Sequence, residues 1–139
     1  MRSKKGFTLI ELMVVILIVG ILAAVIVPIM RGRINAAKWS EGKAMMGTIA
    51  TTIRTYVAEK DSGSAARSLN GAFAVWGPKL GFLQGDFTGA YFRYDDFTVA
   101  SCDYDANNLN TPLSYTITAT KSSLSPTSLT LDEVGVWGP

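Results

Sequence analysis

The pattern of apolar and charged positions predicts an N-terminal helix with two unlike halves. From Leu12 to Met30 no charged side chain interrupts the apolar sequence. A bilayer-spanning helix needs roughly 20 apolar residues, so this run is long enough. A carboxylate, Glu11, stands at its head, although an ionisable group inside a membrane costs about 2.5–3.5 kcal/mol on insertion scales. Such a residue indicates a function and a charged partner.

Residues 31–60 favour a continued helix, now with one apolar face. Glu41 interrupts this face, and Gly42 and Gly47 each weaken the helix by about 1 kcal/mol relative to alanine. The apolar side chains recur at spacings of three and four residues: Ala37, Ala44, Met45, Ile49, Ile53, Tyr56 and Val57. This pattern is typical of a helix that lies on a sheet.

The rest of the chain predicts a small β-rich region. Asp61-Ser62-Gly63-Ser64 ends the helix, and residues 65–85 alternate apolar side chains with glycines, which predicts a loop with a short helix or turn. Strands are expected at Tyr91–Tyr94, Phe97–Cys102, Ser114–Thr120, Leu129–Leu131 and Val134–Trp137. The expected fold is α+β: a long helix, half membrane-spanning and half amphipathic, on an antiparallel sheet of three to four strands.

Before the apolar run stands a short basic segment and then a distinctive motif: Arg2, Lys4, Lys5, Gly6, Phe7, Thr8, Leu9, Ile10, Glu11 and Leu12. With these residues the N-terminus resembles that of type IV pilins and type II secretion pseudopilins. Gly20 and Pro28 also fall where that family carries a helix-weakening glycine and proline. The resemblance divides the chain into a leader (1–6), an assembly helix (7–30), a stalk (31–60) and a loop with a β-rich head (61–139).

The resemblance implies roles for individual residues. A prepilin peptidase would cut between Gly6 and Phe7, and Phe7 would become the N-methylated first residue. Glu11 would pair with the Phe7 amine of a neighbouring subunit, which relieves the desolvation of both charges. The segment between Gly20 and Pro28 would unwind in assembled filaments.

The implied function is that of a structural, non-enzymatic subunit of a type IV pilus or a type II secretion pseudopilus. The precursor would cross the inner membrane once with its head outside the cytoplasm, and then join a surface pilus or a periplasmic pseudopilus. The implied partners are further copies of the chain, the prepilin peptidase, an assembly platform and a cytoplasmic ATPase.

Four alternatives stay open. A secretory signal peptide would be cut near Leu22-Ala23-Ala24, but Glu11 and the apolar run past that point argue against it. A plain membrane anchor leaves Gly6-Phe7 unexplained. A minor pilin at a filament tip would bind DNA or a surface. A non-polymerising anchored domain would remain a monomer.

The charge of the chain gives no support for a nucleic-acid-binding function. Three of the thirteen basic residues precede Phe7, so the chain from Phe7 carries ten basic and eleven acidic residues and gives no support for nucleic-acid binding. The basic residues concentrate in residues 31–60, and the acidic ones in residues 61–139.

Cys102 is the single cysteine, so the chain has no intramolecular disulfide. In this it differs from many type IV pilins, which close a C-terminal loop with a disulfide. We expect Cys102 to be a small buried residue.

Few residues point to other chemistry. Asp103, Asp105 and Asn107 resemble the start of a calcium loop, but Asn108 and Ser114 stand where an EF-hand loop has glycine and glutamate. A turn between strands explains them equally well, so no cofactor is expected. We interpret Asp95-Asp96 as a solvated turn.

Five aromatic residues lie close together in the sequence: Tyr91, Phe92, Tyr94, Phe97 and Tyr104. No basic cluster interleaves them, so we expect them to pack in the fold and not to form a stacking surface for single-stranded nucleic acid.

Overall fold

The computed structural model describes residues 6–139, so Arg2, Lys4 and Lys5 of the expected leader lie outside the described residues. The chain forms two compact units, the first ending at Ala36 and the second comprising Ala37–Pro139. One helix, α1 (Leu9–Lys60), contributes to both units. We call its part from Leu9 to Ala36 the N-terminal half-helix and the second unit the head.

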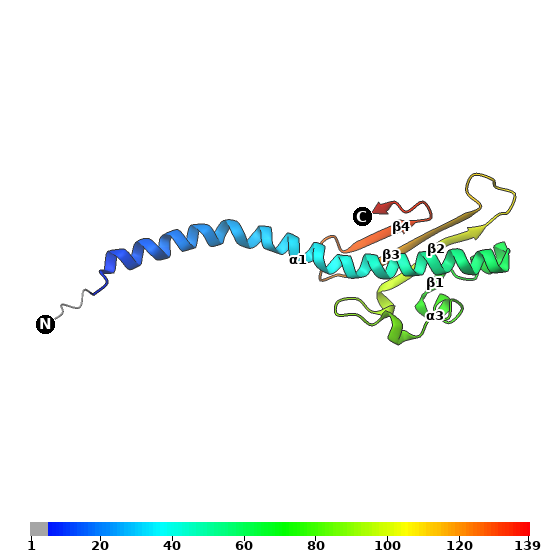
Figure 1. Ribbon diagram of the computed structural model, residues 1–139, viewed down its shortest axis with the longest axis horizontal. Coiled ribbons are helices and arrows are strands. Elements are labelled where there is room, and N and C mark those ends of the chain that lie inside the picture. The colour runs from blue at the N-terminus through cyan, green and yellow to red at the C-terminus, as the bar shows by residue number, and fades with distance from the viewer. Residues whose placement is uncertain (1–5) are drawn as a thin grey trace. The chain divides into compact units, whose positions relative to one another are not determined.

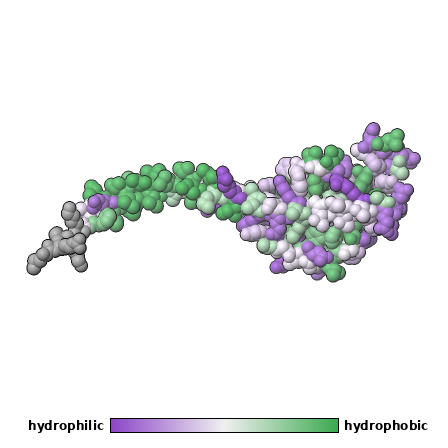
Figure 2. Space-filling view, viewed as in Figure 1, coloured by the Kyte–Doolittle hydropathy of each residue, from purple (hydrophilic) through white to green (hydrophobic). Residues whose placement is uncertain are grey.

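The N-terminal half-helix has no buried side. Every residue from Leu9 to Ile34 is exposed, including the apolar run. Figure 2 shows this surface as an almost continuous apolar band, in contrast to the mixed surface of the head. By length and composition the helix can cross a membrane.

The head contains an antiparallel sheet of five strands in the order β1-β2-β3-β4-β5. The strands are β1 (Gly71–Ala72), β2 (Phe97–Tyr104), β3 (Leu113–Thr120), β4 (Ser128–Asp132) and β5 (Trp137–Gly138). The expected α+β class is confirmed, with a sheet larger than the three to four strands predicted. The two edge strands have two residues each, which is too short to produce an alternating pattern in the sequence.

The second half of α1 lies along this sheet (Figure 1). Ile49, Ile53 and Val57 face the core as predicted. The N-terminal end of the predicted apolar face is wrong: Ala37 and Ala44 are exposed, while Trp39 and Met46 are buried. The reason is that α1 buries its larger side chains there, and Gly42 admits the ring of Phe92, which an added Cβ would approach to 2.9 Å.

The segment between α1 and β2 packs along one side of α1, where Gly81 and Phe82 lie beside Met45. It contains α2 (Gly63–Arg67), α3 (Phe73–Trp76) and two short 3-10 helices, η1 (Gln84–Phe87) and η2 (Tyr94–Asp96). The expected strand at Tyr91–Tyr94 is wrong, because only one bridge, between Thr88 and Arg93, forms there. Phe92 instead turns into the core, with its ring centroid 4.9 Å from that of Trp39.

Candidate functional site

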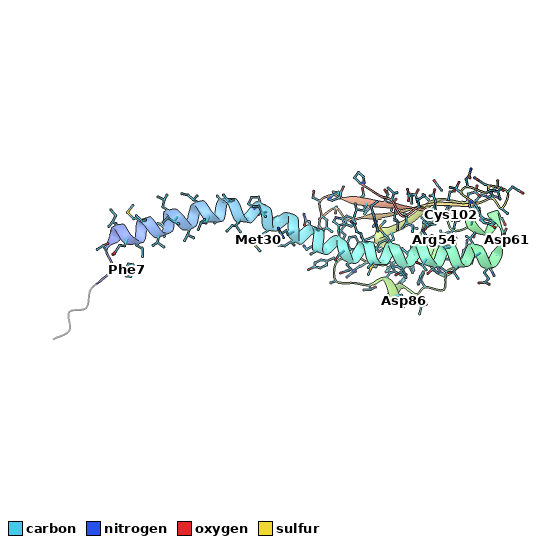
Figure 3. All side chains as sticks on the ribbon, turned by 45° about the horizontal axis from the view of Figure 1, so that its top comes forward. Phe7, Met30, Arg54, Asp61, Asp86 and Cys102 are labelled. Atoms are coloured by element: carbon cyan, nitrogen blue, oxygen red, sulfur yellow. The ribbon has the colours of Figure 1, made fainter. Side chains whose placement is uncertain are left out.

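The N-terminus of α1 is closed by a reciprocal pair of hydrogen bonds between Thr8 and Glu11. The Thr8 N–H and hydroxyl donate to Glu11 Oε2 at 2.8 and 2.6 Å, and the Glu11 N–H donates to Thr8 Oγ1 at 3.3 Å. This is a capping box, which satisfies backbone donors that a helix start otherwise leaves free. Phe7, labelled in Figure 3, precedes it and is 83% exposed.

This cap is a role for Glu11 that the sequence analysis missed. The signal was present, since Thr8-Leu9-Ile10-Glu11 has the Thr-x-x-Glu spacing that precedes an apolar helix. Glu11 therefore has a local structural function in the single chain. Its Oε2 carries the cap, and its Oε1 makes no hydrogen bond within residues 6–139, so one carboxylate oxygen is available to a further donor.

The helix is continuous past both predicted weak points. Gly20 and Pro28 lie inside α1, and no atom lies within 4 Å of the position that a Cβ on Gly20 would take. Pro28 lacks the backbone N–H that would bond to the preceding turn. Unwinding between these two residues stays a prediction for assembled subunits.

In the head, α1 presents a face of small uncharged residues to solvent. Four threonine hydroxyls on this helix donate to the carbonyl oxygen four residues earlier, at 2.9–3.1 Å. Their polar groups are thereby occupied, and their methyl groups are left outward. The exposed residues of this face are Ser40, Ala44, Thr48, Thr51, Thr55 and Ala58. Small residues at such spacing let another helix backbone approach closely.

Two shallow grooves border this face, where α1 meets the segment around Gly81. One has a volume of about 470 Å³ and is lined by Ala44, Met45, Thr48, Gly81, Phe82, Asp86 and Phe87. The other, of about 290 Å³, is lined by Thr52, Thr55, Tyr56, Glu59, Lys79, Leu80 and Gly81. Neither contains a group of catalytic residues.

Glu41 holds the loop that ends in η2 against α1. Its Oε1 accepts hydrogen bonds from the backbone N–H groups of Tyr91 and Phe92, each at 3.0 Å. A Cβ on Gly89 would overlap the Glu41 carboxylate, so only glycine fits this approach. The interruption in the apolar face of the helix is therefore a loop anchor.

The weak calcium candidates do not converge on one point. Asp103 Oδ1 accepts a hydrogen bond from Arg67 Nη1 at 2.7 Å, and Asp105 Oδ1 accepts one from the Asn107 N–H at 2.9 Å. Among residues 6–139, no three or more His, Cys, Asp or Glu side chains are placed to hold a metal ion. The weak calcium candidate stays untested.

Cys102 is a buried thiol. It is fully buried in β2, and burial raises its pKa to about 11, with the nearby Asp103 carboxylate adding to the effect. The side-chain amide of Asn70 bonds to both backbone groups of Cys102, accepting from its N–H at 2.7 Å and donating to its carbonyl at 3.1 Å. Asn70 therefore replaces a missing edge-strand partner where β2 bulges.

The predicted aromatic cluster divides between core and surface. Phe92 and Phe97 are fully buried, while Tyr91 is 47% exposed. The Tyr104 hydroxyl donates to Asp61 Oδ1 at 2.6 Å, and this bond raises the pKa of Tyr104. The aromatic side chains therefore pack the head and join its parts, and they do not form an exposed stacking surface.

Comparisons with known proteins agree with the N-terminal geometry. Residues 1–27 match the model of the prokaryotic N-terminal methylation motif. A type IV major fimbrial protein, FimA of Dichelobacter nodosus, is 40% identical over 87 residues, which are 61% of this chain and 50% of that protein. The type II secretion system core protein G of Pseudomonas aeruginosa is 46% identical over 55 residues, 40% of this chain and 39% of that protein.

A fimbrial protein of Moraxella nonliquefaciens is 47% identical over 55 residues, 40% of this chain and 36% of that protein. The matched part of the chain thus spans half or less of the length of these relatives. No solved structure matches the chain. The chain thus carries the N-terminal methylation motif over residues 1–27 and is similar, over part of its length, to type IV fimbrial proteins and to a type II secretion protein.

Proposed function

We propose that this protein is a structural subunit that is processed between Gly6 and Phe7 and polymerises through its N-terminal half-helix into a pilus or pseudopilus. The observation that carries the proposal is the exposure of that half-helix, whose apolar side chains have no partner in residues 6–139. Burying apolar surface contributes about 25 cal/mol per Å². Lipid covers this surface before assembly, and the half-helices of other copies cover it afterwards.

Glu11 supplies the charge that selects one arrangement of neighbours. Processing creates an amine at Phe7, and a carboxylate from an adjacent chain neutralises it at the edge of the apolar region. Removing one partner of a buried ion pair typically costs about 3–5 kcal/mol. Because only Glu11 Oε2 is used by the cap, Oε1 can accept from the amine of the neighbour without loss of the cap.

The small-residue face of α1 in the head supports the same arrangement. It exposes methyl groups and bonded hydroxyls, which a neighbouring helix can cover without leaving polar groups unsatisfied. The relatives named above are two fimbrial proteins and a secretion protein, so both filament types fit. Assembly would use a prepilin peptidase, an inner-membrane platform and a cytoplasmic ATPase, with the head outside the cytoplasm. The role is structural and not catalytic.

The first test is mass spectrometry of the N-terminus in cells with and without the prepilin peptidase. A chain that starts at N-methylated Phe7, and is absent without the peptidase, supports the proposal. A chain that starts near Ala24 or Val25 contradicts it, because the apolar half-helix would then be a removed signal peptide.

The role of the Glu11 charge is tested separately from its role in the cap. Glu11→Gln keeps a side chain that can accept the Thr8 hydrogen bonds but removes the charge. Thr8→Ala removes the cap but keeps the charge, at a cost of about 1 kcal/mol to the helix. We expect filaments, measured in sheared fractions, to be lost in Glu11→Gln and retained in Thr8→Ala. Normal filaments from Glu11→Gln would show that the charge is not needed.

A further inference from the structure

The two ends of the head carry opposite charge. We call the end with Trp39, Phe92 and Pro126 the proximal end; the Trp39 Nε1–H donates to the Pro126 carbonyl there at 3.0 Å. The distal end contains the C-terminus of α1, the loop between β2 and β3, and the turn after β4. The bond from Tyr104 to Asp61 joins the first two of these parts, and Figure 3 labels Asp61 there.

Three ion pairs among residues 6–139 neutralise part of this charge: Lys60–Glu59, Arg67–Asp103 and Lys121–Asp96. Most of the remaining charge is segregated between the two ends. The proximal end keeps Lys38, Lys43 and Arg93 against Glu41 and Asp95. The distal end keeps Arg54 and Lys79, which lines a groove with Glu59, against four carboxylates: Asp61, Asp105, Asp132 and Glu133.

Two of the connections that carry distal carboxylates are neighbours. Arg54, residues 110–113, Glu133 and Val134 line one groove of about 300 Å³, so the turn after β4 lies beside the loop between β2 and β3. Arg54 Nη2 donates to the backbone carbonyl of Glu133 at 2.9 Å, so this bond does not use the Glu133 carboxylate. The proximal cations are also accessible, since Lys43 and Arg93 are exposed.

Subunits related by a helical operation all point the same way, so contacts along the filament are head-to-tail and join unlike surfaces. We propose that the basic proximal end of one subunit packs against the acidic distal end of a second copy displaced along the filament. This inference rests on the proposed polymerisation. The partner is another copy of this chain, and the attraction between the two ends sets their axial order and favours encounter in the correct polarity.

Charge reversal with compensation tests this contact. The distal variant Asp105→Lys/Glu133→Lys and the proximal variant Lys38→Glu/Arg93→Glu each place like charges opposite each other. None of these four side chains belongs to an ion pair within the described residues. We expect each variant to lower the yield of sheared filaments roughly tenfold. The combined variant, in which both ends are reversed, should recover most of the yield.

A control reverses two charges in the two grooves around Gly81, which neither Asp105 nor Glu133 lines. Lys79→Glu/Asp86→Lys changes the same number of charges and leaves net charge unchanged; Asp86 is labelled midway in Figure 3. We expect normal filaments from it. In wild-type filaments of mixed isotopic labelling, a zero-length carbodiimide should link Lys38 or Lys43 of one copy to Asp105 or Glu133 of another.

The outcomes separate this inference from the proposed function. If the wild-type chain is not processed at Phe7 or forms no filament, the proposed function fails. If wild-type filaments form, but both single-end variants give full yield or the combined variant stays as poor as they are, the axial contact is wrong. Crosslinks between copies that join only other residues would also overturn it.

Discussion

The two halves of α1 are one helix in two different environments. In the N-terminal half-helix every residue from Leu9 to Ile34 is exposed, whereas in the head Ile49, Ile53 and Val57 are almost completely buried against the sheet. Both halves are rich in apolar residues, so apolar content alone does not distinguish them. The difference is that the second half alternates apolar with polar positions, and the first half does not.

The two halves are therefore stabilised by different contacts. The second half is stabilised by burial inside its own chain, which contributes roughly 1.5–3 kcal/mol for each large apolar side chain. The first half has no such contacts among residues 6–139 and depends on lipid or on other subunits. Substitutions in the two halves should therefore separate folding from assembly.

The largest expected effect comes from shortening a buried side chain. Ile53→Ala leaves a cavity in the core of the head and should lower the free energy of unfolding by about 2–5 kcal/mol. The matched change in the first half, Ile16→Ala, should leave unfolding of the head unchanged. Urea unfolding of the full chain in detergent, followed by tryptophan fluorescence, measures both, because all three tryptophans lie in the head. A similar loss from Ile16→Ala would show that the first half of α1 also contributes to the stability of the head.

Two glycines of α1 give the next largest contrast. Gly42→Ala would bring a Cβ to 2.9 Å from the buried ring of Phe92, and such overpacking should cost about 1–3 kcal/mol. Gly47→Ala meets no atom within 4 Å and should stabilise the head by up to about 1 kcal/mol, since alanine favours helix. The same urea titration tests both, and a destabilising Gly47→Ala would contradict the assigned packing.

These glycines also show what could be predicted from the sequence. The capped apolar helix, the amphipathic half and strands β2, β3 and β4 follow from local periodicity and spacing. The role of Gly42 does not, because it depends on Phe92, which is fifty positions away in the sequence. Asn70 likewise pairs with the backbone of Cys102, and no local pattern predicts such a long-range contact.

Of the candidate site, the roles of Gly6, Phe7 and Glu11 were predicted from the motif. The cap was not predicted, although the Thr8–Glu11 spacing in the same motif indicates it. The distal acidic end could only be anticipated as a general charge segregation. Its carboxylates come from the end of α1, the loop after β2 and the turn after β4, and only the sheet topology brings these segments to one end.

Alkaline pH should destabilise the head and not the N-terminal half-helix. The pKa of Cys102 is raised from 9.0 to about 11 in the fold, so its neutral form is favoured there. This contribution is fully present below pH 9 and is lost as pH rises from about 9 to about 11, with a slope of at most about 1 kcal/mol per pH unit. Burial raises the pKa of Tyr115 too, which acts in the same direction.

Urea unfolding at pH 8, 9.5 and 10.5 measures this loss. In Cys102→Ala the free energy of unfolding should depend less on pH. Because Cys102 is the only cysteine, its reaction with iodoacetamide gives a second readout: slow in the folded head and fast in urea. Fast alkylation of the folded protein at pH 8 would show that the thiol is not protected by burial.

The smallest expected effect comes from an ion pair that burial does not strengthen. Lys60 and Glu59 pair at 3.3 Å with side chains that are 48% and 69% exposed, so Lys60→Met should change the free energy of unfolding by less than about 0.5 kcal/mol. The Lys121–Asp96 pair, at 2.6 Å, is only 26% and 17% exposed, and Lys121→Met leaves a partly buried carboxylate, at a cost of roughly 1–2 kcal/mol. Since the two pairs have the same chemistry, the ratio of their effects measures how much burial matters within the head. Equal effects would mean that burial does not strengthen an ion pair within the head.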